Sequence, residues 1–208
     1  MKHNFITIGR EFGSGGHEIG SRLAQRLGMK FYDKELITLA AEKMGFCENF
    51  VEHNDEKKPG LFARSAAFSK GGMYAQLSPE DNIYVTQTIA IRELADAGNC
   101  VIVGRCAGHI LKERDDVVSV FIHAPIEDRV SRKMMLSESE TSASAMKKKI
   151  LAVDKNREKY YNFYTGEKWG DCRNYHICID TSKVGIDGAV EIIVNYIEQN
   201  SAKRILPD

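Results

Sequence analysis

Near its start the chain reads Ile6-Thr7-Ile8-Gly9-Arg10-Glu11-Phe12-Gly13-Ser14-Gly15-Gly16-His17-Glu18-Ile19-Gly20, and this stretch decides the fold. Its first residues form a short apolar, β-branched run, which is typical of a buried strand. The next segment places Ile19, Leu23 and Leu27 four residues apart and ends at Gly28, a pattern that predicts an amphipathic helix. A glycine turn between a strand and a helix directs main-chain N–H groups and the helix N-terminus toward one point, where a phosphate can bind.

This turn differs from the common phosphate-binding loop, G-x-x-x-x-G-K-[ST]. Gly16 stands where that loop has its lysine, and Arg10 stands five residues before Gly15, where that loop has its opening glycine. A glycine-rich turn that binds no ligand is therefore the alternative interpretation. The strand–turn–helix context favours phosphate binding over it.

Length and composition predict one domain over residues 1–208. The chain has 208 residues, 43% of them hydrophobic and 28% charged, with a formal net charge of zero. A neutral chain has no overall attraction to nucleic acid or to acidic membranes, so neither is expected as a partner. The stretches rich in apolar residues are too short for a membrane span or a signal peptide, and a soluble, cytoplasmic protein is expected.

The five cysteines are widely spaced and form no C-x-x-C pair, so we expect neither a zinc site nor a disulfide framework. Cys100 and Cys178 lie in apolar runs and are predicted to be small core residues.

Strands alternate with helices along the rest of the chain. Further strands are predicted at residues 29–33, 100–103, 117–122 and 176–180. Helices are predicted at residues 34–44, 83–97 and 107–113, from Pro125 onward, through 146–157, and at 185–199. Five strands alternating with helices predict an α/β fold with a parallel sheet covered by helices on both faces.

Residues 46–81 are polar and glycine-rich, and two interpretations remain open for them: a mobile insert on the substrate side, or an ordinary surface excursion. Near the end of this segment, Ser78 and Pro79 are a helix-start signal.

Polar residues follow the ends of several predicted strands. The glycine loop at 13–16, Asp33, Arg105 and His123 all stand at such positions. Ligands of parallel sheets bind beyond the carboxyl ends of the strands, so these residues are expected to border one phosphate site. Arg105 directly follows a four-residue apolar strand, where a charge needs a partner.

Several of these motifs resemble the cytidylate kinase-like proteins, a branch of the P-loop nucleoside monophosphate kinases. The resemblance extends over nearly the whole chain. Its most specific parts are the Arg10–Gly20 loop, Phe31-Tyr32-Asp33, Val103-Gly104-Arg105, and Tyr164-Thr165-Gly166 with Trp169. It implies a three-layer P-loop kinase fold with a five-stranded parallel sheet, a small insert, and a helical lid over residues 126–160. ATP and Mg²⁺ are implied as donor and metal.

The resemblance also implies roles for individual residues. The donor nucleotide would be bound by Gly13, Ser14, Gly15 and Gly16. If the protein is a kinase, either Arg10 or His17 would also bind the donor, in place of the missing lysine. The acceptor would be bound by Asp33, Arg105 and Asp154. The transferring phosphoryl group would be contacted by Arg129, Arg132 and Arg157. Glu18, which replaces the magnesium-binding threonine of cytidylate kinases, would bind the metal directly.

Structural alternatives remain for several of these residues. Arg129 and Arg132 share a helix face with acidic neighbours and alone favour a solvated surface. Asp33 is also a candidate helix cap, and a structural role is favoured for His123. The aromatic residues between Tyr160 and Trp169 favour packing over base stacking.

Three functions follow from these features. The first is ATP-dependent phosphoryl transfer to a nucleoside monophosphate, with CMP or dCMP favoured as acceptor. The second is nucleotide or anion binding without catalysis, the activity lost with the loop lysine. The third is a small-molecule kinase with a non-nucleotide acceptor, because Leu39 and Cys106 differ from the acceptor residues of cytidylate kinases. A homodimer is left open.

Overall fold

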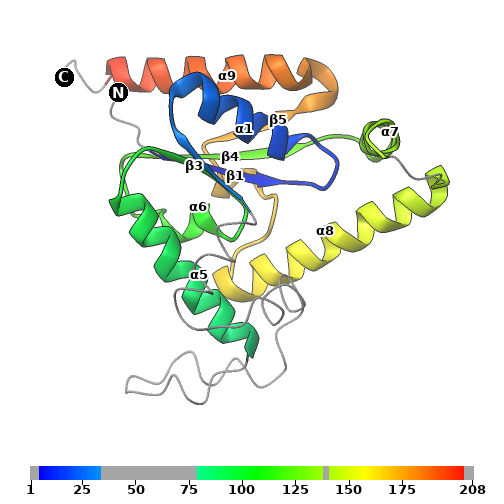
Figure 1. Cartoon of the computed structure of the whole chain (residues 1–208), viewed down its shortest axis with the longest axis horizontal. Helices are drawn as coiled ribbons and strands as arrows, with labels where there is room; N and C mark the ends of the chain where they lie inside the picture. The colour runs from blue at the N-terminus through cyan, green and yellow to red at the C-terminus, as the bar shows by residue number, and fades with distance from the viewer. Residues whose placement is uncertain (1–4, 34–78, 138–140, 204–208) are drawn as a thin grey trace.

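The computed structural model describes residues 5–33, 79–137 and 141–203, which form a parallel sheet between two layers of helices (Figure 1). Its strands are β1 (Phe5–Arg10), β2 (Lys30–Tyr32), β3 (Cys100–Val103), β4 (Val117–His123) and β5 (Ile177–Asp180). Its helices are α1 (Gly16–Leu27), α5 (Pro79–Asp96), α6 (Ala107–Ile110), α7 (Ile126–Met135), α8 (Ala143–Thr165) and α9 (Thr181–Lys203), with a 3-10 turn at Cys172–Asn174.

The strand order is β2-β3-β1-β4-β5, with every neighbouring pair parallel. β1 is central: Phe5 is in register with Cys100 of β3 and with Val117 of β4. The connection that leaves β1 therefore runs toward the β2 edge of the sheet, whereas the connection that leaves the neighbouring strand β4 runs toward the β5 edge. The carboxyl end of β1 lies at the switch point, where parallel sheets bind ligands.

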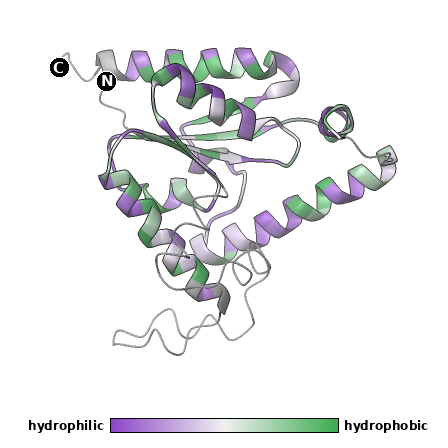
Figure 2. Cartoon of the chain, in the orientation of Figure 1, coloured by the Kyte–Doolittle hydropathy of each residue, from purple (hydrophilic) through white to green (hydrophobic). Residues whose placement is uncertain are grey.

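Side chains alternate between the two faces of the sheet because successive residues of a strand point in opposite directions. Ile6 and Ile8 of β1 face α1 and α9, where they join Leu23 and Ile193 in one buried cluster. Phe5 faces the opposite way, into a second cluster built with α5 and α6. Figure 2 shows hydrophobic and hydrophilic residues alternating along the helices that cover the sheet. The predicted α/β fold with helices on both faces is confirmed.

The helical boundaries differ from the sequence prediction at several places. α6 is shorter than predicted and ends at Ile110 instead of residue 113. α5 begins at Pro79, so the last three residues of the predicted insert belong to this helix. α8 continues through the aromatic segment to Thr165, well beyond the predicted 146–157. α9 begins at Thr181, but Gly185 has φ 67° and kinks it, so the regular helix resumes where it was predicted.

Cys178 is exposed, so the prediction that it is a core residue is wrong, whereas Cys100 is buried as predicted. β5 is one of the two edge strands of the described sheet, and Cys178 points away from the core cluster that includes Ile177 and Ile179. Partial burial still raises the pKa of its thiol. The predicted helix at 34–44 and most of the insert at 46–81 lie outside the described residues.

Candidate functional site

The β1–α1 connection forms the glycine loop predicted from the sequence. Gly13 and Gly15 have φ of 88° and 90°, values that side-chain-bearing residues rarely adopt. Gly15 occupies the N-cap of α1, and no side chain among the described residues caps this helix. The first N–H groups of α1 are therefore available to an anion at the switch point of the sheet.

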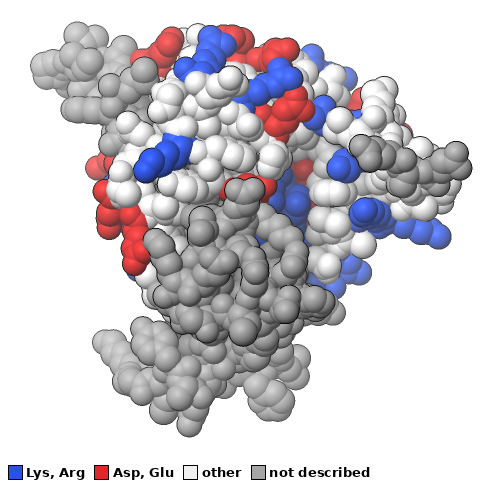
Figure 3. Space-filling view, in the orientation of Figure 1, with Lys and Arg blue, Asp and Glu red and all other residues white. Residues whose placement is uncertain are grey.

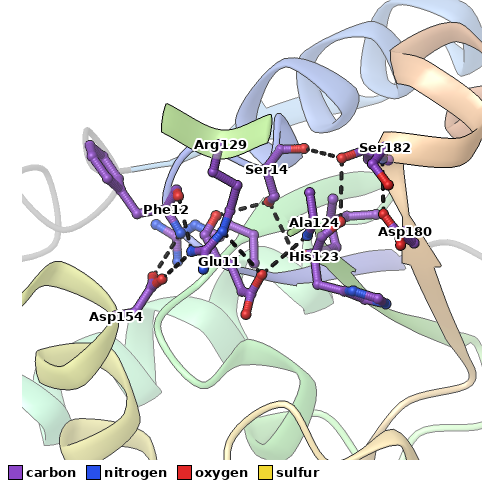
Figure 4. A network of polar contacts seen from close by, with 12 residues as sticks. Glu11, Phe12, Ser14, His123, Ala124, Arg129, Asp154, Asp180 and Ser182 are labelled. Atoms are coloured by element: carbon purple, nitrogen blue, oxygen red, sulfur yellow. Dashed lines mark hydrogen bonds and ion pairs between the residues drawn. The ribbon is translucent and has the colours of Figure 1, made fainter. Parts of the chain in front are cut away.

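Ser14 holds the loop from inside. Its side chain is buried, and its hydroxyl donates to the carbonyl oxygens of Glu11 (2.8 Å) and Ile122 (3.1 Å). The carbonyl of Ser14 accepts from the Thr181 hydroxyl at 2.8 Å. The Glu11 carboxylate accepts from the Ala124 amide at 3.1 Å. These contacts attach the loop to the ends of β4 and β5 (Figure 4).

Arg129 of α7 lies in a buried polar cluster under the same loop (Figure 4). Its side chain is 7% exposed and pairs with Asp154 of α8, whose own side chain is 13% exposed. The other oxygen of Asp154 accepts the Phe12 amide of the loop at 2.7 Å. Arg129 also lies 3.5 Å from the Glu11 carboxylate. The prediction that Arg129 lies on a solvated helix face is therefore wrong. This arginine joins α7, α8 and the loop.

Arg132, one helical turn farther along α7, reaches the first turn of α1. It pairs with the Glu18 carboxylate through one oxygen, while the other oxygen pairs with Arg22. Arg22 in turn pairs with Asp187 of α9, on a surface over α1 and α9 where basic and acidic side chains lie side by side (Figure 3). Burial by itself raises the pKa of Glu18, but the hydrogen bond and charge of Arg132 and then of Arg22 outweigh it and hold that pKa below its ordinary value. Glu18 is therefore ionised and fully engaged by guanidinium groups.

A strained turn follows β3. Gly104, Arg105 and Cys106 have φ of 88°, 57° and 56° in succession, and two of them carry side chains. Left-handed backbone at such residues costs on the order of 1–3 kcal/mol each and is concentrated at functional sites. This turn places the Arg105 side chain, which is 9% exposed, beside the end of β1.

Three of the predicted arginines border one cavity at this edge of the sheet. Arg10, Arg105 and Arg157 line it together with Thr7, and its volume is about 40 Å³. The Thr7 hydroxyl is buried and has no hydrogen-bond partner among the described residues. Arg157 also donates to the Arg10 carbonyl at 3.2 Å. The space is large enough for water and too small for a nucleotide without some rearrangement of its walls.

The cavity is closed on one side by aromatic packing. Tyr160 and Tyr161 of α8 are buried against Cys106, with Trp169 beside them. Tyr84 of α5 stacks on Tyr164 at 4.0 Å between ring centroids. This agrees with the packing role that was favoured for the aromatic segment.

His17 and Asp33 form a pair away from this cavity. The His17 Nε2 lies 2.8 Å from an Asp33 oxygen, and 63% of the histidine side chain is exposed. Asp33 follows β2, at the carboxyl edge where the sequence predicted it, and His123 ends β4 at the same edge. The structure thus gathers the predicted residues along one edge of the sheet but separates their side chains into four groups. These are the Arg10–Arg105–Arg157 cavity, the Arg129–Asp154 pair, the Arg132–Glu18 pair and the His17–Asp33 pair.

Sequence reasoning missed Glu11, Phe12, Thr181 and Thr7 as parts of the site. Phe12 lies under two cations, with its ring centroid 4.9 Å from Lys133 Nζ and 5.5 Å from Arg157 Cζ. The partners of Phe12 and Glu11 are more than 100 residues away in sequence. No local pattern carries such contacts.

Among the described residues, no group of three or more His, Cys, Asp or Glu side chains is arranged to hold a metal ion. No helix in the described part of the chain is both long and apolar enough to cross a membrane.

Comparison with solved structures supports the fold described above. The chain is similar to a shikimate kinase from Bacteroides thetaiotaomicron, with a TM-score of 0.56 at 13% identity over 94% of this chain and 98% of that one. It is also similar to an uncharacterized protein from Eubacterium ventriosum, with a TM-score of 0.70 at 30% identity over 94% of this chain and 98% of the other. The chain therefore has the α/β fold of P-loop kinases, a parallel sheet between two layers of helices.

The family can be stated more narrowly. The model of the cytidylate kinase-like family matches residues 5–183, and the chain belongs to that family. A cytidylate kinase from Pyrococcus horikoshii is 28% identical over 93% of this chain and 88% of its own length. One from Methanococcus vannielii is 28% identical over 93% of this chain and 99% of its own length.

Proposed function

We propose that the protein transfers the terminal phosphoryl group of ATP to a nucleoside monophosphate, with CMP or dCMP as the favoured acceptor. Family membership supports a nucleotide kinase, and the curated relatives named above are cytidylate kinases. The observation that carries the proposal is the convergence of arginines from β1, the β3 turn and α8 beside the glycine loop. Such a site supplies what phosphoryl transfer requires, which is positioning and positive charge.

In the proposed reaction an oxygen of the acceptor phosphate attacks the γ-phosphorus of ATP. A new P–O bond forms to the acceptor, and the bond from the γ-phosphorus to the β–γ bridging oxygen breaks, so that ADP leaves with that electron pair. The main-chain amides of residues 13–16 bind the β-phosphate at the N-terminus of α1. Arg105 binds the acceptor phosphate at the end of β3, and Arg157 neutralises charge on the transferring group from α8.

Arg132 and Glu18 must separate in this mechanism. Arg132 contacts the γ-phosphate only after it leaves the Glu18 carboxylate with which it now pairs. Glu18 has a suitable oxygen ligand for Mg²⁺, but both of its oxygens are engaged by arginines, so its present contacts do not fit the metal. Arg129 and Asp154, in contrast, are too deeply buried and too well paired to contact a nucleotide directly. We assign both to positioning the loop.

The proposal is tested by a coupled ADP-release assay with ATP, Mg²⁺ and each nucleoside monophosphate in turn. We expect turnover with CMP or dCMP, and a loss of about 10²-fold or more in kcat/KM for Arg105→Ala, the scale typical of a missing charge-stabilising group. Arg26→Ala is the matched control, because Arg26 lies on α1 and pairs with Glu191 at the surface. Binding of ATP without turnover on any monophosphate would contradict the proposal and favour a non-catalytic protein. Turnover with a non-nucleotide acceptor alone would also contradict it.

A further inference from the structure

The glycine loop of this chain has an arginine where the common loop has its first glycine, and a glycine where the common loop has its lysine. The structure explains why these two changes occur together. A Cβ atom built on Gly16 would lie 2.6 Å from the Arg10 Cβ and 3.1 Å from its Cγ. The position of the Arg10 Cβ is set by the main chain, so no rotation of the side chain removes the contact with that atom. Any side chain at position 16 is incompatible with one at position 10.

The far end of the Arg10 side chain lies beside a second glycine. Its guanidinium group lies against Gly104, where an added Cβ would collide with Nη1 and would stand 3.0 Å from Cζ. Gly104 also has φ 88° and donates its amide to the Ile8 carbonyl at 2.9 Å. Arg10 therefore passes between two glycines, one at the start of α1 and one at the end of β3.

This path delivers the Arg10 side chain to the cavity that it lines with Arg105 and Arg157. His17, the other candidate to replace the lysine, pairs with Asp33 instead, and its side chain is mostly exposed. Arg10 therefore carries a positive charge from the glycine loop to the place where donor and acceptor phosphates would meet.

We propose that Arg10 replaces the loop lysine as the cation on the transferring phosphoryl group, and that Gly16 is required to be glycine because Arg10 occupies its side-chain space. This inference rests on the proposed kinase function for its chemical part, while its steric part is independent. A guanidinium group offers several N–H donors in one plane and can bind two phosphate oxygens at once. The site thus keeps a positive charge, but the residue that supplies the charge stands at the end of strand β1 instead of the start of helix α1.

Double substitution at positions 10 and 16 tests whether Arg10 has taken the role of the loop lysine. Gly16→Lys alone should lower Tm by several degrees and reduce turnover, because the new side chain meets Arg10. Arg10→Gly alone should lower kcat/KM by about 10²-fold. Arg10→Gly/Gly16→Lys restores the common loop, so it should regain the Tm of Arg10→Gly and exceed the turnover of both single variants at least tenfold. Arg10→Met/Gly16→Lys is the matched control: its methionine stem still blocks position 16, and no rescue is expected.

Each contrary result overturns a defined part of the inference. Unchanged Tm and turnover in Gly16→Lys would refute the steric exclusion. Wild-type turnover in Arg10→Gly, or equal rescue by the Gly and Met double variants, would refute the exchange of roles. If the native protein phosphorylates no monophosphate, the proposed function fails, but Arg10 is still tested by calorimetry with inorganic triphosphate. There Arg10→Gly should bind at least tenfold more weakly than Arg26→Ala, and equal binding would refute the role of Arg10.

Discussion

The Arg129–Asp154 pair beneath the glycine loop yields a sharp stability prediction. Asp154→Ala would leave the Arg129 guanidinium, 7% exposed, without its main counter-charge. It would also remove the acceptor of the Phe12 amide. Removing one member of a buried ion pair costs about 3–5 kcal/mol, because the remaining charge stays out of water. For a chain of this size each kcal/mol lowers Tm by about 2–4 °C, so we expect a fall of about 6–20 °C.

The control is an ion pair at the surface. Arg26 and Glu191 join α1 to α9, with side chains 47% and 52% exposed. Exposed pairs of this kind contribute about 0–1 kcal/mol, so Glu191→Ala should change Tm by no more than a few degrees. Thermal unfolding followed by circular dichroism measures both variants under the same conditions.

A double variant separates burial from pairing. Arg129→Met/Asp154→Leu removes both charges and keeps apolar volume, so it should be more stable than Asp154→Ala. Its turnover should nevertheless be reduced, because Phe12 loses the carboxylate that positions its amide. Equal, small decreases in Tm for Asp154→Ala and Glu191→Ala would refute the conclusion that this pair is buried and holds the loop.

Two further predictions concern titration and thiol reactivity. The pKa of Glu18 lies below its ordinary value of 4.5, so the stabilisation from its pairing with Arg132 is complete above pH 4.5 and is lost as the pH falls through the folded-state pKa. The difference in Tm between the native protein and Glu18→Gln should therefore shrink between pH 6 and about pH 3, and a constant difference would contradict the pairing. In a Cys47→Ser background, a thiol reagent at pH 7 should label Cys172 before Cys178. Both residues are exposed, but partial burial of the Cys178 thiol raises its pKa and so lowers the fraction present as the reactive thiolate. Labelling of Cys178 first would contradict this order.

The parts of the fold that sequence predicted well are those where one residue pattern serves one purpose. Residues 100–103 are apolar throughout because β3 is buried on both faces, and the predicted strand has the observed bounds. The end of α8 was underestimated because Tyr160, Tyr161 and Tyr164 were separated from the helix as an aromatic segment. Their spacing in fact continues the helical face that packs against Cys106.

Side-chain partners in the site were harder to predict, because they are distant in sequence. Acidic residues next to Arg129 suggested a solvated helix face, but its partner is Asp154, 25 residues later. Glu18 was expected to bind a metal, a role that stays a prediction, and its contact with Arg132 depends on where α7 lies relative to α1. The relative position of two helices follows from three-dimensional packing and leaves no periodic pattern in the sequence.

The most direct test of the proposed site is a crystal structure with Mg²⁺, a non-hydrolysable ATP analogue and CMP. We predict the β-phosphate within hydrogen-bonding distance of the main-chain amides of residues 13–16, the Arg10 guanidinium on the γ-phosphate, and Arg105 on the phosphate of CMP. A donor bound elsewhere, or an Arg10 side chain that contacts neither nucleotide, would contradict the account.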